Sequence, residues 1–358
     1  SEVSTGTDGY EIRLEGVESS FVNSHLVTRS VKNFYPVLSP KQSGQEGRLI
    51  EVKGLTRKYG DLVAVDGVSF SIGRGEVVGL LGHNGAGKTT IMRMLTGYIE
   101  PTAGSVVIDG MLLSRERLGI QRKLGYLSEN APLYPDMSVV RYLEYVADLR
   151  GVQRADRLAV LKRALERTWL TDRALDPVGT LSKGYKQRLG VAQAIIHEPE
   201  ILILDEPTNG LDPAQIFQMR SLVGDLSRNA TIIISTHILQ EVEAICERVI
   251  IMVQGQIAVD ALLSELQRSN RLVVGLGNPS EDAAERLREI PGVGLVSVVV
   301  GPRGESYGLE LEGSVNAVAP QVARVAVEGG WGLYGMSEES RTLETVFREV
   351  GEKGRHAE

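Results

Sequence analysis

The chain has 358 residues, which at roughly 150 residues per domain suggests about two domains. Hydrophobic residues make up 42% and charged residues 24%, so the composition is that of an ordinary globular protein and excludes wholesale disorder. The 39 basic and 46 acidic residues give a net charge of −7, which argues against a protein whose main work is to neutralise a nucleic-acid backbone.

The chain begins with a segment of weak pattern that is followed by short strands. Residues 1–47 carry clusters of Ser, Gly and Pro, and we expect a poorly ordered extension there, or an extra strand or two. Residues 49–52, 62–65 and 68–72 have the pattern of short strands separated by turn residues. The continuous apolar run Val77–Leu81 predicts a strand that is buried on both faces.

Helices and strands then alternate. A helix is expected over residues 88–96, and residues 138–169 carry two amphipathic helical patterns. Strands are expected at 201–204 and 231–235, each followed by a helical segment. Because strands that alternate with helices form parallel sheets, we expect an α/β domain with a mostly parallel sheet. The longest apolar runs have four or five residues, whereas a membrane span needs about 20, so we expect a chain that crosses no bilayer by itself.

The last part of the chain has a different order of elements. From about residue 271 the pattern reads β-α-β-β-α-β and ends in a further helix from Arg341, which is the order of a ferredoxin-like α+β unit. We therefore expect an extension over 1–47, an α/β domain over 48–268 and an α+β accessory or regulatory domain over 269–358.

A glycine-rich segment joins the buried strand to the first helix. It fits the phosphate-loop pattern Gly-x4-Gly-Lys-Ser/Thr in the strand–loop–helix context that the pattern requires. Glycines let backbone N–H groups turn inward around phosphates, and the helix N-terminus adds a positive dipole end. Lys88 supplies a point charge for the β- and γ-phosphates, and the Thr89 hydroxyl can complete a Mg²⁺ shell. The predicted nucleotide-binding positions of this segment are Gly82, His83, Asn84, Gly85, Ala86, Gly87, Lys88, Thr89 and Thr90.

Two acids follow the strand at 201–204. Asp205 is delivered to the carboxyl end of the sheet, where ligands of open α/β sheets bind, and we expect it on the Mg²⁺ side. Glu206 can face the γ-phosphate and polarise an attacking water. Together with the phosphate loop these acids indicate a nucleoside triphosphatase, and a GTPase is not indicated because no guanine-reading Asn/Thr-Lys-x-Asp motif is found.

Residues 181–188 indicate which family of nucleoside triphosphatases the chain resembles. Their sequence, Leu-Ser-Lys-Gly-Tyr-Lys-Gln-Arg, resembles the signature motif of the ATP-binding cassette (ABC) ATPases, whose pattern is Leu-Ser-Gly-Gly-Gln. Ser182 and Gly184 match that pattern, whereas Lys183 and Tyr185 depart from it. In the family this segment faces the ATP of the opposite subunit, so the resemblance implies a head-to-tail dimer with two ATP molecules between the chains.

Other family motifs follow in the family's order. Tyr59 corresponds to the aromatic residue that stacks on adenine, and residues 210–213 resemble the loop by which the subunits sense each other. His237 resembles the switch histidine that contacts the γ-phosphate. Glu129 stands where the family usually has the glutamine that binds Mg²⁺, and a carboxylate can still serve as that ligand. Glutamate here, together with the Ser-Lys-Gly-Tyr signature at residues 182–185, resembles the branch that pairs with ABC-2-type exporters, including the ATPases of gliding-motility machines.

The resemblance covers about residues 49–350 and implies the P-loop NTPase core of the ABC ATPases, with a helical signature subdomain at about residues 130–185. It implies an ATP-hydrolysing subunit that forms a homodimer, or pairs with another ABC subunit, around ATP and Mg²⁺. The partner would be an integral membrane permease on a separate chain, with no nucleic acid bound, and the protein would lie on the cytoplasmic face of the plasma (inner) membrane. The expected catalytic residues are Glu206, His237 and Lys88, the metal ligands Thr89, Glu129 and Asp205, and the outer nucleotide contacts Tyr59, Ser182 and Gly184.

Two alternatives stay open at this point. The first is a soluble ABC-type ATPase that regulates a ribosomal or nucleic-acid complex. Only one phosphate loop is found, and no long heptad coil interrupts the cassette, which weighs against this alternative. The second keeps the dimer but makes it a regulator, with the C-terminal unit as a ligand sensor.

Overall fold

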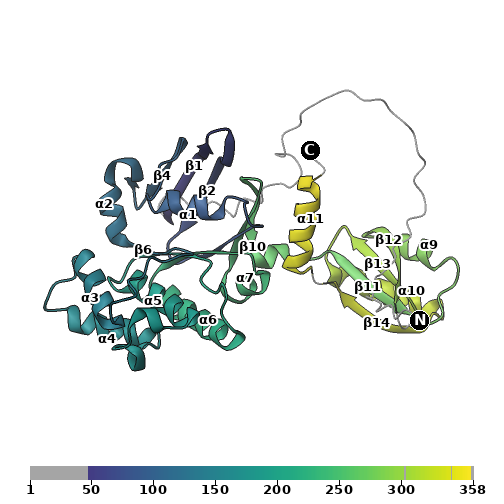
Figure 1. Ribbon diagram of the computed structural model, residues 1–358. Helices are drawn as coiled ribbons and strands as arrows, with labels where there is room; N and C mark the ends of the chain where they lie inside the picture. Colours follow the sequence, from purple (N-terminus) through teal and green to yellow (C-terminus); the bar gives the residue numbers. More distant parts are fainter. Residues whose placement is uncertain (1–46, 302–303, 340, 356–358) are drawn as a thin grey trace, which may run out of the picture. The chain divides into compact units, whose positions relative to one another are not determined.

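The structure, a computed structural model, describes residues 47–301, 304–339 and 341–355 (Figure 1). These residues divide into two compact units. Of the described residues, the first unit contains those from Gly47 to Glu265 together with those from Leu343 onward, and the second contains those within Leu266–Thr342. The expectation for residues 1–47 falls almost entirely outside the described residues.

The first unit contains an antiparallel sheet in the strand order β2-β1-β4-β5. Its two longest strands pair with several register shifts, each a β-bulge or another irregularity of the ladder. The strands are β1 (Arg48–Tyr59), β2 (Leu62–Gly73), β4 (Ala103–Ile108) and β5 (Met111–Leu112).

The second sheet of this unit has the order β10-β9-β3-β8-β7-β6, and all of its pairings are parallel except β10 with β9. Every residue of β3, β7 and β8 is buried, as the continuous apolar runs in their sequences predict. The strands are β3 (Val77–Leu81), β6 (Leu124–Leu127), β7 (Ile201–Asp205), β8 (Thr231–Thr236), β9 (Arg248–Val253) and β10 (Gln256–Leu262).

Some helices of the first unit share one of two hydrophobic cores. One hydrophobic core joins both sheets and the helix α1, which contributes four buried residues to it. A separate core holds α3, α4 and α5 together. It lies where the helical subdomain was expected, at about residues 130–185, but continues to Ile196 because most of α5 follows the expected end. The helices are α1 (Lys88–Leu95), α2 (Leu113–Lys123), α3 (Val139–Leu149), α4 (Arg157–Arg167), α5 (Lys183–Ile195), α6 (Pro213–Ser227), α7 (Leu239–Ile245) and α8 (Leu263–Leu266).

The second unit is an antiparallel sheet in the order β12-β13-β11-β14 with a core shared by two helices. The β-α-β-β-α-β order expected from the sequence is therefore confirmed. The elements are β11 (Arg271–Leu276), α9 (Ala283–Arg288), β12 (Val293–Gly301), β13 (Gly304–Leu311), α10 (Val315–Glu328) and β14 (Leu333–Glu338).

The last helix, α11 (Leu343–Arg355), differs from the expectation. The C-terminal domain was expected to include it, but α11 groups with the first unit, where it packs on α7 and β9. The reason is apolar burial, because Leu343, Val346 and Val350 recur on one face of the helix and all three are buried. None of the helices in the described part of the chain combines the length and the apolar character that a membrane span needs.

His197, which follows α5, is a largely buried histidine that we expect to make folding sensitive to pH. Its Nε2 lies 3.2 Å from the carbonyl oxygen of Leu124. Burial, reinforced by the nearby charge of Arg150, lowers the pKa of His197 from 6.5 to about 4. Between these two values the unfolded chain binds a proton that the folded chain does not, so the free energy of unfolding rises with pH in this window.

We predict that this contribution is complete above about pH 6.5 and is lost as the pH falls toward about 4, with a total of up to about 3 kcal/mol. Urea unfolding of the wild type and of His197→Gln, measured across this range, checks the prediction. The variant removes the titrating group but keeps an amide that can donate to Leu124, so its profile should be flatter. Identical pH profiles of the two proteins would contradict the assignment.

Candidate functional site

The phosphate-loop segment spans the gap between β3 and α1. Gly87 has φ +102°, and a Cβ atom there would lie 2.6 Å from the carbonyl oxygen of Ala64, so no other residue fits this backbone without strain. Gly87 is also the N-cap of α1, and no side chain caps the helix there. The first amides of α1 are therefore available to an anion. The other predicted positions of the loop, His83, Asn84, Gly85 and Ala86, lie in the same turn, and Thr90 lies in the first turn of α1.

The Lys88 side chain folds back over this loop. It is only 6% exposed, and its Nζ donates hydrogen bonds to the carbonyl oxygens of Gly82 at 2.7 Å and His83 at 3.3 Å. The same Nζ lies 3.7 Å from Oε1 of Glu206. The one positive charge of the loop is thus held at its centre, within reach of the acids that follow β7.

Asp205 ends β7 and is completely buried. Its Oδ1 accepts hydrogen bonds from the hydroxyls of Ser235 and Thr89, the latter at 3.3 Å. Its Oδ2 has no hydrogen-bond partner among the residues the structure describes. A buried carboxylate oxygen without a partner is costly, and a divalent cation beside Thr89 would satisfy it. The predicted ligands Thr89 and Asp205 therefore fit Mg²⁺.

Glu206, directly after this strand, has a strained backbone conformation. Its φ of +50° lies in the left-handed region, which costs free energy for a residue other than glycine. The main chain is held there by its N–H group, which donates to the carbonyl oxygen of Ser235 at 3.0 Å. The carboxylate is 6% exposed, and its Oε2 lies 2.9 Å from Nδ1 of His237. The structure therefore brings the three predicted catalytic residues, Lys88, Glu206 and His237, together.

The surroundings of Glu206 act on its protonation in opposite directions. Burial raises the pKa of this carboxyl above its usual range, whereas the charges of His237 and Lys88 lower it, and burial has the larger effect. A carboxyl with a raised pKa is a better proton acceptor, which suits a general base.

The signature segment begins α5. Ser182 is the N-cap of this helix, and its Oγ accepts from the N–H of Tyr185 at 3.5 Å. Gly184 is buried, and a Cβ there would lie 2.5 Å from the side chain of Gln215 on α6. Within the described residues, no hydrogen bond or ion pair joins Ser182 or Gly184 to the phosphate loop of the same chain. The same helix does contact the site, because Nε2 of Gln187 donates to the carbonyl oxygen of Glu206 at 3.3 Å.

Two predicted outer contacts remain. Tyr59 ends β1, is 44% exposed, and has the guanidinium of Arg57 4.6 Å from its ring centre. Glu129 is exposed, and within the described part of the chain no hydrogen bond or ion pair joins it to Thr89 or Asp205. These two positions are available to a ligand but are not assembled with the buried centre.

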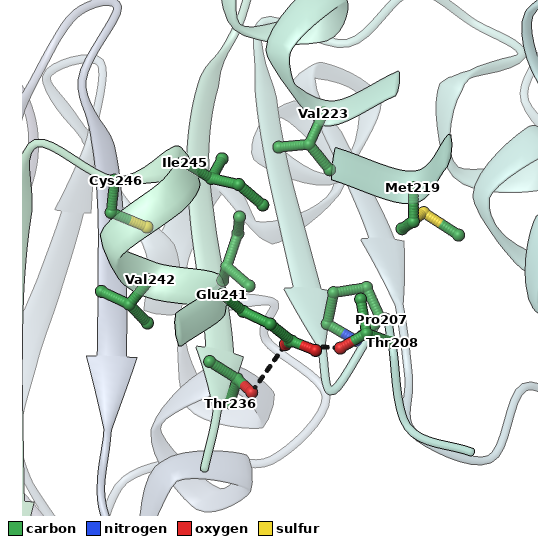
Figure 2. Close-up of a pocket in the computed structure, with 10 residues that line it drawn as sticks. Pro207, Thr208, Met219, Val223, Thr236, Glu241, Val242, Ile245 and Cys246 are labelled. Atoms are coloured by element: carbon green, nitrogen blue, oxygen red, sulfur yellow. Dashed lines mark hydrogen bonds between the residues drawn. The ribbon is translucent and has the colours of Figure 1, made fainter. Parts of the chain in front are cut away.

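The sequence analysis did not identify a buried carboxylate on α7 that links two strand ends. Glu241 is 2% exposed, and its Oε2 accepts hydrogen bonds from the hydroxyls of Thr208 and Thr236. Figure 2 shows these three side chains at the edge of a small cavity of about 10 Å³, which is otherwise mostly apolar. Thr208 lies two residues after Glu206, and Thr236 directly precedes His237. Glu241 thus fixes the segments that carry both functional residues.

Comparison with known proteins agrees with this geometry. The sequence profile described as ABC transporter matches residues 65–209. The bacitracin transport ATP-binding protein BcrA of Bacillus licheniformis is 39% identical over 225 residues, which are 62% of this chain and 72% of that protein. The chain belongs to the ABC transporter family, and it is an ATP-binding, ATP-hydrolysing subunit.

Solved structures give the same result. A structure described as the ATP-binding subunit of an ABC transporter is 32% identical, with a TM-score of 0.57, over 61% of this chain and 91% of that chain. The cassette MJ0796, described as a dimeric post-hydrolysis state bound to ADP and Pi, is 25% identical with a TM-score of 0.56, over 60% and 99% of the two chains. The expected fold and the expected ATPase class are confirmed.

We predict that Glu241→Ala lowers the free energy of unfolding by about 3 kcal/mol, because it removes a charged acceptor from two buried hydroxyls. Urea unfolding monitored by circular dichroism measures this. Gln240→Ala, on the exposed face of the same helix, is the matched control and should change stability by less than about 0.5 kcal/mol. A Glu241→Ala protein as stable as the control would contradict the conclusion that Glu241 fixes the segments that carry Glu206 and His237.

Proposed function

We propose that the buried centre around Glu206 is the site of ATP hydrolysis and that each of its residues has a distinct role. The loop amides and Lys88 bind the phosphates, and His237 contacts the γ-phosphate. Glu206 orients and deprotonates the attacking water. The observation that carries this proposal is the position of one buried carboxylate 3.7 Å from the loop lysine and 2.9 Å from the histidine. The ammonium group of Lys88 and the ring N–H of His237 are groups to which a γ-phosphate could also bind.

Mg²⁺ is proposed as the metal of this site. Thr89 and Asp205 would hold it, because they meet at 3.3 Å and one oxygen of Asp205 lacks a partner among the described residues. Glu129 is proposed as a further ligand, as its place in the family's motif order implies. When bound, the cation would neutralise charge on the phosphates and orient them. The protein itself excludes water from this centre by the burial of Asp205 and Lys88.

The complete site is proposed to need two chains. Ser182 and Gly184 stand at the start of α5, where a hydroxyl and helix amides can bind an anion, yet neither is joined to the phosphate loop of its own chain. A head-to-tail partner would bring these groups to the ATP bound by the other chain, while Tyr59 stacks on the adenine. The partner is a second copy of this chain or a paired ABC subunit.

This dimer is proposed to drive an ABC-2-type permease on a separate chain, in the direction of export. The relative BcrA is described as a bacitracin transport protein, which supports a transporter rather than a ribosomal or nucleic-acid complex. The net charge of −7 also weighs against nucleic acid as a partner. The helical subdomain α3–α5 would pass the motion to the permease, and the protein would act on the cytoplasmic face of the membrane.

We predict that Glu206→Gln lowers kcat for Mg²⁺-ATP by roughly 10² or more, because the amide cannot accept the proton of the attacking water. ATP binding should stay near wild type, since the contacts of Lys88 and the loop are retained. Phosphate release and equilibrium ATP binding by the purified chain measure the two quantities.

Glu247→Gln, an exposed carboxylate outside the site, is the matched control and should hydrolyse ATP at the wild-type rate. Normal turnover by Glu206→Gln would show that Glu206 is not the base.

A further inference from the structure

The final helix, α11, belongs to the first unit, although the α+β unit precedes it in the chain. The N–H of Leu343 donates to Oε1 of Glu243 on α7 at 3.2 Å, and Leu343, Val346 and Val350 are buried. These contacts attach α11 to α7 and β9. Leu343, Val346 and Val350 account for the burial of the apolar face of α11. They do not account for two other positions of the helix, which contact a different part of the unit.

Those remaining contacts reach the phosphate loop. The ring of Phe347 lies against the ring of His83, with the ring centres 4.8 Å apart and the planes inclined by 55°. One helical turn further on, a Cβ on Gly351 would lie 3.7 Å from Nε2 of His83. The side chain of His83 therefore rests on one face of α11, although it is otherwise exposed. Phe347 is only half-buried, so covering the core is not its main contribution.

The main-chain carbonyl of His83 accepts two hydrogen bonds from other residues of the loop. Its carbonyl oxygen accepts hydrogen bonds from Nζ of Lys88 at 3.3 Å and from the N–H of Ala86 at 3.1 Å. The lysine is also held by the carbonyl oxygen of Gly82 at 2.7 Å, so the His83 carbonyl is one of two that position its charge. A side-chain contact that restrains His83 therefore also restrains one bond to Lys88 and the bond that closes the turn.

The strand on which α11 packs meets the same loop. A Cβ on Gly82 would lie 2.7 Å from the carbonyl oxygen of Met252, the fifth residue of β9. The N–H of Gly255, just beyond β9, donates to the carbonyl oxygen of Ala86 at 3.2 Å. The helix α11 therefore supports the loop through His83 directly and through β9 at its other side.

We propose that Phe347 is a positioning residue for the phosphate loop: it holds His83, and through the His83 carbonyl it holds Lys88 and the loop amides in the arrangement that receives the phosphates of ATP. The inference rests on the proposed role of this loop as the nucleotide site. It assigns to the C-terminal helix a part in nucleotide binding that is separate from the α+β unit preceding it in the chain.

The test is the steady-state kinetics of Mg²⁺-ATP hydrolysis by the full chain. Phe347→Leu keeps the apolar volume but loses the ring, and Phe347→Ala removes both. For each variant we expect KM for ATP to rise by about 2- to 10-fold, the range expected for one aromatic contact, with kcat within about 2-fold of wild type. The loss would fall on KM because Lys88 and the loop amides bind the phosphates before and during the reaction. Arg348→Ala, at the next and exposed position of α11, is the control and should leave both constants unchanged.

A double-mutant cycle with His83→Ala separates positioning from general support of the fold. If Phe347 acts through His83, its replacement should have little further effect on KM in a His83→Ala background, so the two losses should not add. Additive losses, or an unchanged KM in Phe347→Leu, would overturn the inference. Thermal unfolding of each variant accompanies the assay, and Phe347→Leu decides the outcome where Phe347→Ala fails to fold. A wild-type chain that neither binds nor hydrolyses ATP would instead overturn the proposed function of the site.

Discussion

The structure depends on one electrostatic constraint: the negative charge of a carboxylate that is buried just after a parallel strand must be compensated by groups around it. Glu206 is 6% exposed and sits in a backbone conformation that costs free energy, yet it is held there by the main chain of Ser235. The charge of Lys88 lies on one side of this carboxylate and the ring nitrogen of His237 on the other. Removing either partner would leave the carboxylate buried with less compensation, which is why the loop, the acid and the histidine depend on one another.

This constraint explains how one site can respond to the γ-phosphate. Lys88 and His237, which contact Glu206, are the groups proposed to contact the γ-phosphate, so binding of ATP at this proposed site would redistribute contacts that already exist. ADP lacks the group that would compete for His237. A differential affinity of this kind is what a nucleotide needs in order to shift the equilibrium between separate and paired chains.

Much of this centre could be predicted from the sequence because its signals are local. The glycine pattern ending in Lys88 and the apolar strand before Asp205 each identify their own position. Glu241 and Phe347 could not be predicted, since their partners are brought near only by the fold. Phe347 lies far along the chain from His83, and its helical pattern resembles that of any surface helix. The placement of α11 with the first unit was missed for the same reason, because its apolar face does not indicate which surface it covers.

The most direct test is the mass of the purified Glu206→Gln protein in solution, measured by light scattering with Mg²⁺ and either ATP or ADP. If bound γ-phosphate is what joins two copies around the site, the mass should be that of two chains with ATP and of one chain with ADP. The same mass with both nucleotides would contradict the account.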